Sequence, residues 1–329
     1  MKIVVYFFCF LLYIGSYGQG KKYVTVERSA KLMGYDFKFT IVAENEDIAY
    51  INIQEAIAEI TRIEKIISSW DATSETSKVN KNAGIAAVEV SKELFELVER
   101  ALKISEQTKG AFDISYASLD KVWRFDGSMK YPPTEKDIEM SVANINYKNI
   151  ILNKEKRTIF LKTKGMKIGF GAIGKGYAAD KAKELMQRKN VYAGIINGSG
   201  DLTTWGKQVS GEKWAIGVTN PLDKGKVFSW IPVIESSVAT SVNHEKYVVF
   251  NGERYSHIIN PKTGYPSTGI TSVSVFAQRA ELCDALATSI FIMGVEKGLS
   301  FINNLKGVDV IIIDANNKIH QSSGMSLKK

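Results

Sequence analysis

Hydrophobic and polar positions recur with two different periods along this chain, which predicts both helices and strands. Apolar residues at three- and four-residue intervals predict helices over residues 51–67, 92–108, 177–188 and 281–305. Shorter apolar or alternating runs predict strands over residues 24–26, 37–42, 150–152, 158–161, 193–196, 214–219, 227–234, 237–240, 248–250, 255–259 and 308–313. Helices and strands occur in mixed order, and this order favours an α+β fold.

The first residues have the pattern of an export signal. Met1 and Lys2 precede an apolar run over residues 3–14, which is too short to span a bilayer comfortably. Small residues follow at Ser16 and Gly18. We therefore expect residues 1–18 to be a signal peptide and residues 19–329 to be the mature, exported protein. A retained leader that anchors the protein to the membrane is the alternative.

Composition and charge narrow the class of protein. The full sequence has 45% hydrophobic and 24% charged residues, which is enough apolar surface for the mature chain to form one large domain or two intimate lobes. Removal of the leader leaves Cys283 as the single cysteine, which excludes an internal disulfide. The net charge of +8 comes from scattered lysines with no basic stripe, so we expect no nucleic-acid partner. An anionic small molecule or a membrane surface suits this charge better.

One histidine lies beside a rigid turn. The chain has three histidines, and His257 belongs to a predicted strand that runs into the turn at residues 260–264, Asn-Pro-Lys-Thr-Gly. An imidazole with a pKa near ~6.5 can take a proton from a hydroxyl group at neutral pH, which makes His257 a candidate general base. A half-buried strand histidine bonded to a backbone carbonyl is the alternative interpretation.

A glycine-rich segment carries the second candidate feature. Gly169, Gly171 and Gly174 match the spacing of a dinucleotide-binding loop, and the following Lys175 gives a near match to a phosphate-binding P-loop. The P-loop also needs Ser or Thr where this chain has Gly176, and the dinucleotide fold needs an acid where the next strand ends in Asn197. The segment therefore predicts an anion site formed by backbone amides and a lysine. A glycine-rich connection without a ligand is the alternative.

Asp284 and Thr288 are four residues apart on a predicted helix, so they share one face. A carboxylate and a hydroxyl in this arrangement suit Mg²⁺, which prefers oxygen ligands. Alternatively, Asp284 compensates the helix dipole and Thr288 bonds back to the preceding turn.

Several further motifs accompany these features in a fixed order along nearly the whole mature chain. They are Met33-Gly34, Ser74-Glu75 with Asn80, Gly110-Ala111-Phe112-Asp113 with Trp123, residues 171–177 with Asp180, residues 197–201 (Asn-Gly-Ser-Gly-Asp), Ala239-Thr240-Ser241, residues 257–266 and residues 284–288. With these motifs the chain resembles the ApbE family of FAD:protein FMN transferases.

The resemblance implies a single ApbE-like α+β domain related to the T-fold. It also implies Mg²⁺-dependent cleavage of FAD, transfer of FMN to a Thr or Ser hydroxyl of a target protein, and release of AMP. By this likeness Asp284, Thr288 and the carbonyl of Ala172 hold the metal, and His257 deprotonates the acceptor hydroxyl. The residues implied for FAD binding are Met33, Trp70, Ala111, Phe112, Asp113, Lys175 and Ile258.

The chain departs from the family pattern at two positions. Gly169 replaces an acid six residues before the lysine, and Val242 replaces a glycine after Thr240-Ser241. Two rivals to the transferase therefore stay open, namely a metal-dependent FAD pyrophosphatase and a flavin-binding protein without turnover. The expected partner is a membrane redox subunit, and the expected location is the periplasm, with possible attachment to the inner membrane.

Overall fold

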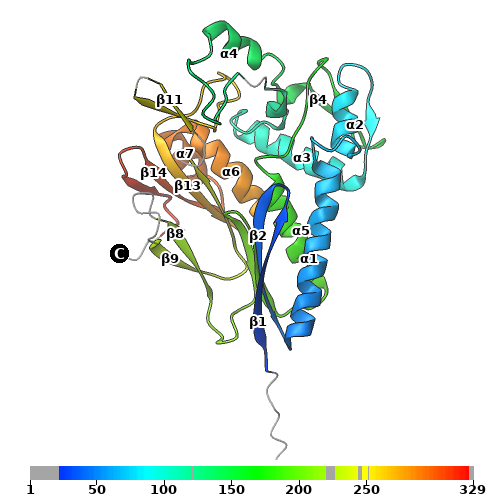
Figure 1. The fold of residues 1–329 in the computed structure, drawn as a ribbon, viewed down its shortest axis with the longest axis vertical. Coiled ribbons are helices and arrows are strands. Elements are labelled where there is room, and N and C mark those ends of the chain that lie inside the picture. The colour runs from blue at the N-terminus through cyan, green and yellow to red at the C-terminus, as the bar shows by residue number, and fades with distance from the viewer. Residues whose placement is uncertain (1–21, 120–121, 220–226, 244–246, 251, 326–329) are drawn as a thin grey trace, which may run out of the picture.

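An eight-stranded antiparallel sheet forms the centre of the computed structural model, which describes residues 22–119, 122–219, 227–243, 247–250 and 252–325 (Figure 1). The predicted leader lies outside these residues. The order of the strands across the sheet is β1 (Val24–Leu32), β2 (Tyr35–Ala43), β6 (Ala193–Gly198), β7 (Asp201–Trp205), β10 (Ser237–Val242), β13 (Ile270–Ala277), β14 (Asp309–Asp314) and β15 (Ile319–Gln321).

Side chains alternate between the two faces of this sheet. In β2, Phe37, Phe39 and Ile41 are fully buried in the main core, whereas Val42 belongs to a second core on the opposite face. The strand predicted for residues 37–42 therefore has apolar side chains on both faces of the sheet, because both faces are covered.

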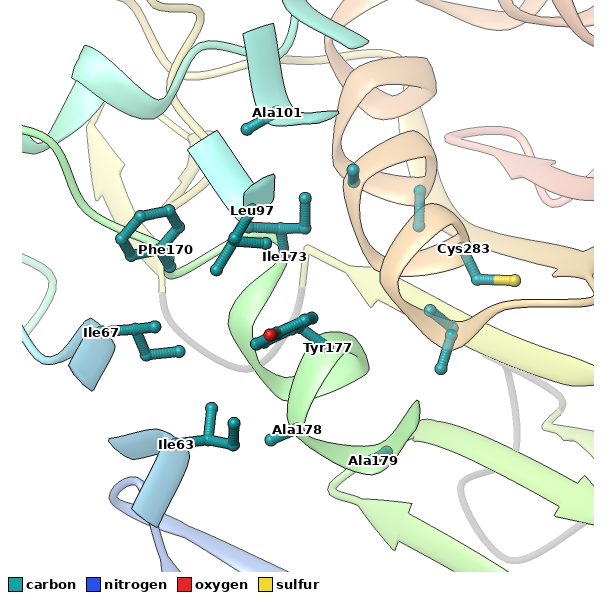
Figure 2. Packing of buried hydrophobic residues seen from close by; sticks show 14 of the residues in the cluster. Ile63, Ile67, Leu97, Ala101, Phe170, Ile173, Tyr177, Ala178, Ala179 and Cys283 are labelled. Atoms are coloured by element: carbon teal, nitrogen blue, oxygen red, sulfur yellow. The ribbon is translucent and has the colours of Figure 1, made fainter. Parts of the chain in front are cut away.

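Three helices cover one face: α1 (Glu46–Ile67), α5 (Gly174–Arg188) and α6 (Ala280–Met293). Asn45 caps α1 by accepting a hydrogen bond from the N–H of Ile48 at 2.9 Å. Figure 2 shows the core between these helices, where Tyr177 of α5 lies close to Ile63 of α1 and Leu97 of a neighbouring helix. This packing fixes α5 between α1 and α6.

A hairpin covers the other face. It consists of β8 (Trp214–Thr219) and β9 (Val227–Val233). Trp214 is buried there with Phe276 and Ile311 of the central sheet.

Most of the remaining elements form a lobe at one end of the sheet (Figure 1). They are the helices α2 (Glu75–Lys81), α3 (Lys92–Gln107) and α4 (Glu135–Ser141), the 3-10 turns Ile114–Ser118 and Tyr147–Asn149, the small sheet of β3 (Val88–Glu89), β5 (Thr158–Leu161) and β4 (Ile150–Asn153), and the hairpin of β11 (Tyr247–Phe250) and β12 (Glu253–Ser256). Trp123, Ile138, Val248 and Ile259 form a small core inside this lobe.

The structure corrects some predicted boundaries. The prediction of one helix over residues 281–305 is wrong, because Gly294 at φ 83° ends α6 and α7 (Val295–Asn303) follows as a separate helix. The strand predicted over 255–259 ends at Ser256, and Ile259 forms only an isolated bridge with Pro266. Helices α1 and α5 begin earlier than predicted, at Glu46 and Gly174. Within the described ranges, no helix is long and apolar enough to cross a membrane.

Candidate active site

A buried cluster of charges lies where α5 begins. The Lys175 ammonium nitrogen is 2.9 Å from Oδ2 of Asp201, the first residue of β7, and 3.7 Å from Oδ1 of Asp284 on α6. Both aspartates are buried. Burial alone would lower the pKa of Lys175, but the two carboxylates outweigh this effect and raise the pKa above its usual value. The lysine is therefore charged at neutral pH.

Two carboxylates share this single ammonium group. Burial and the neighbouring Asp284 carboxylate raise the pKa of Asp201 to about 8, although Lys175 opposes this rise. The site thus has more negative than positive charge when both acids are ionised. A bound cation would correct this imbalance.

The crossing of α5 and α6 sets the position of Asp284. The N–H of Gly176 donates to Oδ2 of Asp284 at 3.2 Å. A Cβ atom on Gly176 would lie 2.2 Å from the carbonyl oxygen of Ala280, so only glycine permits this close approach. Asp180, one turn further along α5, accepts hydrogen bonds from the N–H groups of Ala280 and Glu281, both at 2.9 Å. Asp180 therefore caps α6 from outside that helix.

Other oxygen atoms that suit a hard cation belong to α6 and to the turn before α5. Thr288 follows one turn later on α6, and its hydroxyl oxygen is 3.5 Å from the hydroxyl of Ser241 on β10. Ala172 lies half-buried in the turn that leads into α5. The described residues include no cluster of three or more His, Cys, Asp and Glu side chains that could hold a metal. A cation here would therefore depend on the hydroxyl of Thr288 and the carbonyl of Ala172 as well as on Asp284, an all-oxygen set that fits Mg²⁺.

Met33 and the loop at Trp70 approach the same glycine-rich turn. Met33 lies in the β1–β2 turn at φ 53°, and its N–H donates to Glu64 of α1 at 3.1 Å. A Cβ atom on Gly174 would lie 3.5 Å from Cε of Met33, and one on Gly169 would lie 3.7 Å from Oγ of Ser69. Trp70, next to Ser69, is 82% exposed.

The structure explains both departures from the family pattern. A Cβ atom on Gly169 would lie 2.9 Å from Cβ of Ala117, so Ala117 takes the space that a side chain would need. Val242 is the last residue of β10 and pairs with Ser272 of β13. A β-branched side chain is suited to such a strand position.

A second group of predicted site residues lies in the lobe. The Asp113 carboxylate accepts hydrogen bonds from the N–H and hydroxyl of Ser115 and from the N–H of Tyr147, at 2.6 to 2.9 Å. Burial raises the pKa of Asp113, and these hydrogen bonds partly offset the rise. Ala111 and Phe112 precede it and are buried.

One hydrogen bond connects this lobe to the histidine segment. The indole Nε1–H of Trp123 donates to the carbonyl of Gly264 at 2.8 Å, inside the small core of the lobe. His257 is half-buried directly after β12, and the carbonyl of the buried Ile258 accepts a hydrogen bond from the N–H of Ser267 at 2.7 Å. The segment from Ser256 to Gly264 is thus fixed to the lobe through its turn.

The contacts place the predicted residues in two groups. Lys175 and Asp284 meet at the α5–α6 crossing, with Thr288 one turn along α6 and with Ala172 and Met33 at the glycine-rich turn. The lobe contains the others, namely Ala111, Phe112, Asp113, His257 and Ile258. Sequence reasoning assigned no role to Asp201 or Ser241, although both belong to the quoted motifs. The sequence offered one signal for Asp201, because this acid directly follows a glycine turn and begins a strand. A buried acid at such a position is unusual.

Comparisons with known proteins match these observations. The model of the ApbE family matches residues 33–312. An FAD:protein FMN transferase of Klebsiella pneumoniae is 30% identical over 302 residues, covering 91% of this chain and 92% of that protein. One of Treponema pallidum is 27% identical over 333 residues, covering 96% and 92%. The crystal structure of an ApbE protein from Thermotoga maritima superposes with a TM-score of 0.83 at 29% identity, covering 92% of this chain and 98% of that one. This likeness confirms the predicted α+β fold.

Proposed function

This chain belongs to the ApbE family, and on that premise we propose that it is an FAD:protein FMN transferase. It cleaves the diphosphate of FAD, forms a phosphoester between FMN and a Thr or Ser hydroxyl of a target protein, and releases AMP. The observation that carries this proposal is the approach of Lys175 to Asp284 where α5 crosses α6, with Thr288 one turn further along α6 and the glycine-rich turn directly before α5. A buried carboxylate and a hydroxyl that suit Mg²⁺, next to a lysine, match what a diphosphate substrate requires.

Asp284, Thr288 and the carbonyl of Ala172 would hold Mg²⁺ in this enzyme. When bound, the metal supplies charge stabilisation to the diphosphate oxygens. Lys175 adds a fixed positive charge, since Asp201 and Asp284 keep it protonated. At the start of α5 the N–H of Gly174 donates to the carbonyl of Phe170 and that of Gly176 to Asp284, so the positive end of the helix dipole faces the Asp284 carboxylate.

His257 is the proposed general base. The acceptor oxygen attacks the phosphorus of the FMN moiety, the bond from that phosphorus to the AMP oxygen breaks, and the hydroxyl proton passes to an imidazole nitrogen of His257. AMP carries away the electron pair of the broken bond. Trp70 offers an exposed ring face, and Met33, Ala111, Phe112, Asp113 and Ile258 complete the proposed FAD contacts.

The direct test is product analysis. The purified protein is incubated with FAD and MgCl₂, with and without an acceptor that the Klebsiella pneumoniae transferase modifies, and the acceptor is weighed by mass spectrometry. We expect covalent FMN on the acceptor and AMP in solution. Formation of FMN and AMP without an acceptor would instead favour the pyrophosphatase, and intact FAD in all reactions would favour a binding protein.

Two variants test the role of the histidine. His257→Ala should abolish transfer while FAD binding, measured by flavin fluorescence, stays close to that of the wild type. His320→Ala is the matched control, because His320 pairs with Asp314 at 2.8 Å in the β14–β15 hairpin. Equal loss of FAD binding and transfer in His257→Ala would mean that His257 is a structural residue.

Metal binding can be measured separately from FMN transfer. MgCl₂ should raise the melting temperature of the wild-type protein, because a ligand that binds only the folded state stabilises it. Asp284→Asn should lose this rise, whereas Asp126→Asn, in an exposed loop, should retain it. If Asp284→Asn kept the full Mg²⁺-induced rise in melting temperature, Asp284 would not be a ligand of the metal.

We also propose that the protein is exported and acts on periplasmic segments of membrane redox proteins. The apolar run at residues 3–14 supports export. N-terminal sequencing of protein isolated from cell fractions tests this proposal, with a start at Gln19 as the expected result. A start at Met1 in a membrane fraction would indicate a retained leader instead.

A further inference from the structure

A pocket of about 490 Å³ opens on the lobe behind the loop that begins at Gly110. Its walls include the end of α3, the 3-10 turn Tyr147–Asn149 and the turn at Pro261. Lys109, Lys148 and Lys262 line it, one from each of these three segments. The proposed reaction assigns no role to these lysines.

The pocket is positively charged. None of the three lysines forms an ion pair with another residue that the structure describes. Two carboxylates, those of Glu106 and Asp113, also line the pocket. Three ammonium groups therefore face two carboxylates, an excess of one positive charge, and three hydrogen bonds from neutral donors hold the Asp113 carboxylate in its own loop.

The backbone holds two of these lysines in place. Lys109 has φ 51°, in the left-handed region that L-residues rarely adopt, and Gly110 follows at φ 79°. The N–H of Gly110 donates to the carbonyl of Ser105 at 2.7 Å, which closes the end of α3. A Cβ atom on Gly110 would lie 3.3 Å from Cε of Lys262, so the stem of Lys262 lies across this glycine.

The pocket is close to the proposed chemistry. Pro261, in its wall, is four residues from His257, so their Cα atoms are at most ~14 Å apart even along a fully extended chain. Gly110 directly precedes the Ala111 to Asp113 loop of the proposed FAD site. A polypeptide whose hydroxyl reaches His257 can therefore place a residue a few positions away in this pocket, at ~3.3 Å per residue.

We propose that Lys109, Lys148 and Lys262 form a docking site for an acidic segment of the acceptor protein, adjacent to the hydroxyl that receives FMN. This proposal rests on the proposed function. A polypeptide suits the pocket better than a single phosphate ion, because the lysines are exposed, come from three segments and surround an open volume. Lysine side chains present hydrated point charges, which suit flexible carboxylates without demanding one geometry. Such pairs set partner choice and encounter rate.

Transfer kinetics test the proposal. The triple variant K109Q/K148Q/K262Q is compared with K156Q/K213Q/K318Q, which removes the same charge from exposed lysines elsewhere. With a competent acceptor that has acidic residues near its Thr, the pocket variant should raise KM for the acceptor roughly tenfold while kcat and FAD binding are retained. The control variant should change KM less than twofold.

A matched acceptor completes the test. When its acidic residues are replaced by Asn and Gln, the wild-type enzyme should show the raised KM, and the pocket substitutions should add little to it. Equal KM values for the pocket and control variants with the acidic acceptor would overturn the docking site. A wild-type enzyme that modifies no acceptor would overturn the proposed function instead.

A direct binding measurement separates failure of the docking site from failure of the proposed function. A labelled acidic peptide from the acceptor is titrated against the FAD-free proteins by fluorescence anisotropy, at low and at physiological salt. Weaker binding by the pocket variant alone supports the proposal. Equal binding by both variants, or displacement of the peptide by AMP or pyrophosphate at equal concentration, would show that the lysines recognise something other than the acidic segment.

Discussion

Single buried polar groups hold the site together, and Asp180 is the clearest case. Burial raises the pKa of Asp180 to about 6, against 3.8 for a free aspartate, while its two hydrogen bonds to α6 and the nearby Arg279 oppose the rise. An acid whose pKa is higher in the folded state binds a proton more tightly there. Its ionisation therefore costs stability as the pH rises from about 4 to about 6.

We expect the substitution Asp180→Asn to remove this pH-dependent loss of stability. The difference in unfolding free energy between the wild type and Asp180→Asn should shift by up to ~3 kcal/mol in favour of the variant between pH 4 and pH 7. At pH 4 the variant should be the less stable protein, since an amide has one acceptor oxygen for two N–H groups. Urea unfolding at several pH values measures the difference. A difference that is constant over this range would show that Asp180 titrates normally in the folded protein.

Trp123 has a comparable role in the lobe, because its indole N–H is the buried donor to the carbonyl of Gly264. The substitution Trp123→Phe leaves that carbonyl without this donor and should cost about 1–3 kcal/mol of unfolding free energy. It should also lower the transfer rate, since Gly264 belongs to the turn that follows His257. Thermal unfolding and steady-state kinetics measure the two effects.

Trp205→Phe is the matched control for this prediction. Trp205 is buried, and its indole N–H donates to the carbonyl of Val191 at 3.0 Å, away from the lobe. This variant should lose similar stability and keep its kcat. Equal losses of kcat in the two variants would mean that transfer depends on general stability and not on the Trp123 anchor.

At the scale of elements, the crossing of α5 and α6 decides the geometry of the site. The substitution Gly176→Ala gains about 1 kcal/mol of helix propensity. The new methyl group would lie 2.2 Å from a backbone oxygen, and such overpacking costs typically 1–3 kcal/mol, more where only backbone movement relieves it. We expect a net loss of about 2 kcal/mol and a shift of α6 that separates Asp284 from Lys175. Thermal unfolding and the Mg²⁺-induced change in melting temperature measure these effects.

Gly171→Ala is the control, because a Cβ atom there meets nothing within 4 Å and Gly171 has no positive φ. Its stability should stay within about 0.5 kcal/mol of the wild type. If Gly176→Ala kept both its stability and its Mg²⁺ response, the close crossing would not be what positions Asp284.

The helices also show what the sequence could and could not predict. Apolar periodicity identified α1, α3 and α5, since each buries one continuous face. The same signal joined α6 and α7, because apolar residues at helical spacing continue past Gly294, at Val295, Leu299 and Ile302, although the backbone breaks at this glycine. The spacing of Asp284 and Thr288 was sufficient to place them on one face of a helix. Nothing in that spacing reveals Gly176 as the residue against which Asp284 is held, because this contact joins two distant helices.

At the scale of the whole molecule, the order of the strands across the sheet could not be predicted from the sequence. Most strands were predicted, but the neighbours β2 and β6 are joined across about 150 residues of intervening chain. This pairing, followed by β7, brings Asp201 beneath α5 and α6. Its burial, and so its pairing with Lys175, follows from the layering of sheet and helices and not from its local motif. The resemblance to the ApbE family supplied the connection that local patterns lacked.

The two groups of site residues lie on the sheet body and on the lobe, so a ligand that contacts both should stabilise both at once. FAD with Mg²⁺ should slow hydrogen exchange at residues 171–176, at 111–118 and at 257–266. Mg²⁺ alone should protect only the first of these segments, because Asp284, Thr288 and Ala172 all belong to the sheet body and its helices.

Hydrogen exchange measured by mass spectrometry gives the protection of each segment separately. Strands β8 and β15 serve as internal controls, since they lie away from both groups, on the hairpin that covers the opposite face and at the far edge of the sheet. Protection confined to one group in the presence of FAD and Mg²⁺ would contradict a shared site, since one dinucleotide would then contact the sheet body or the lobe but not both.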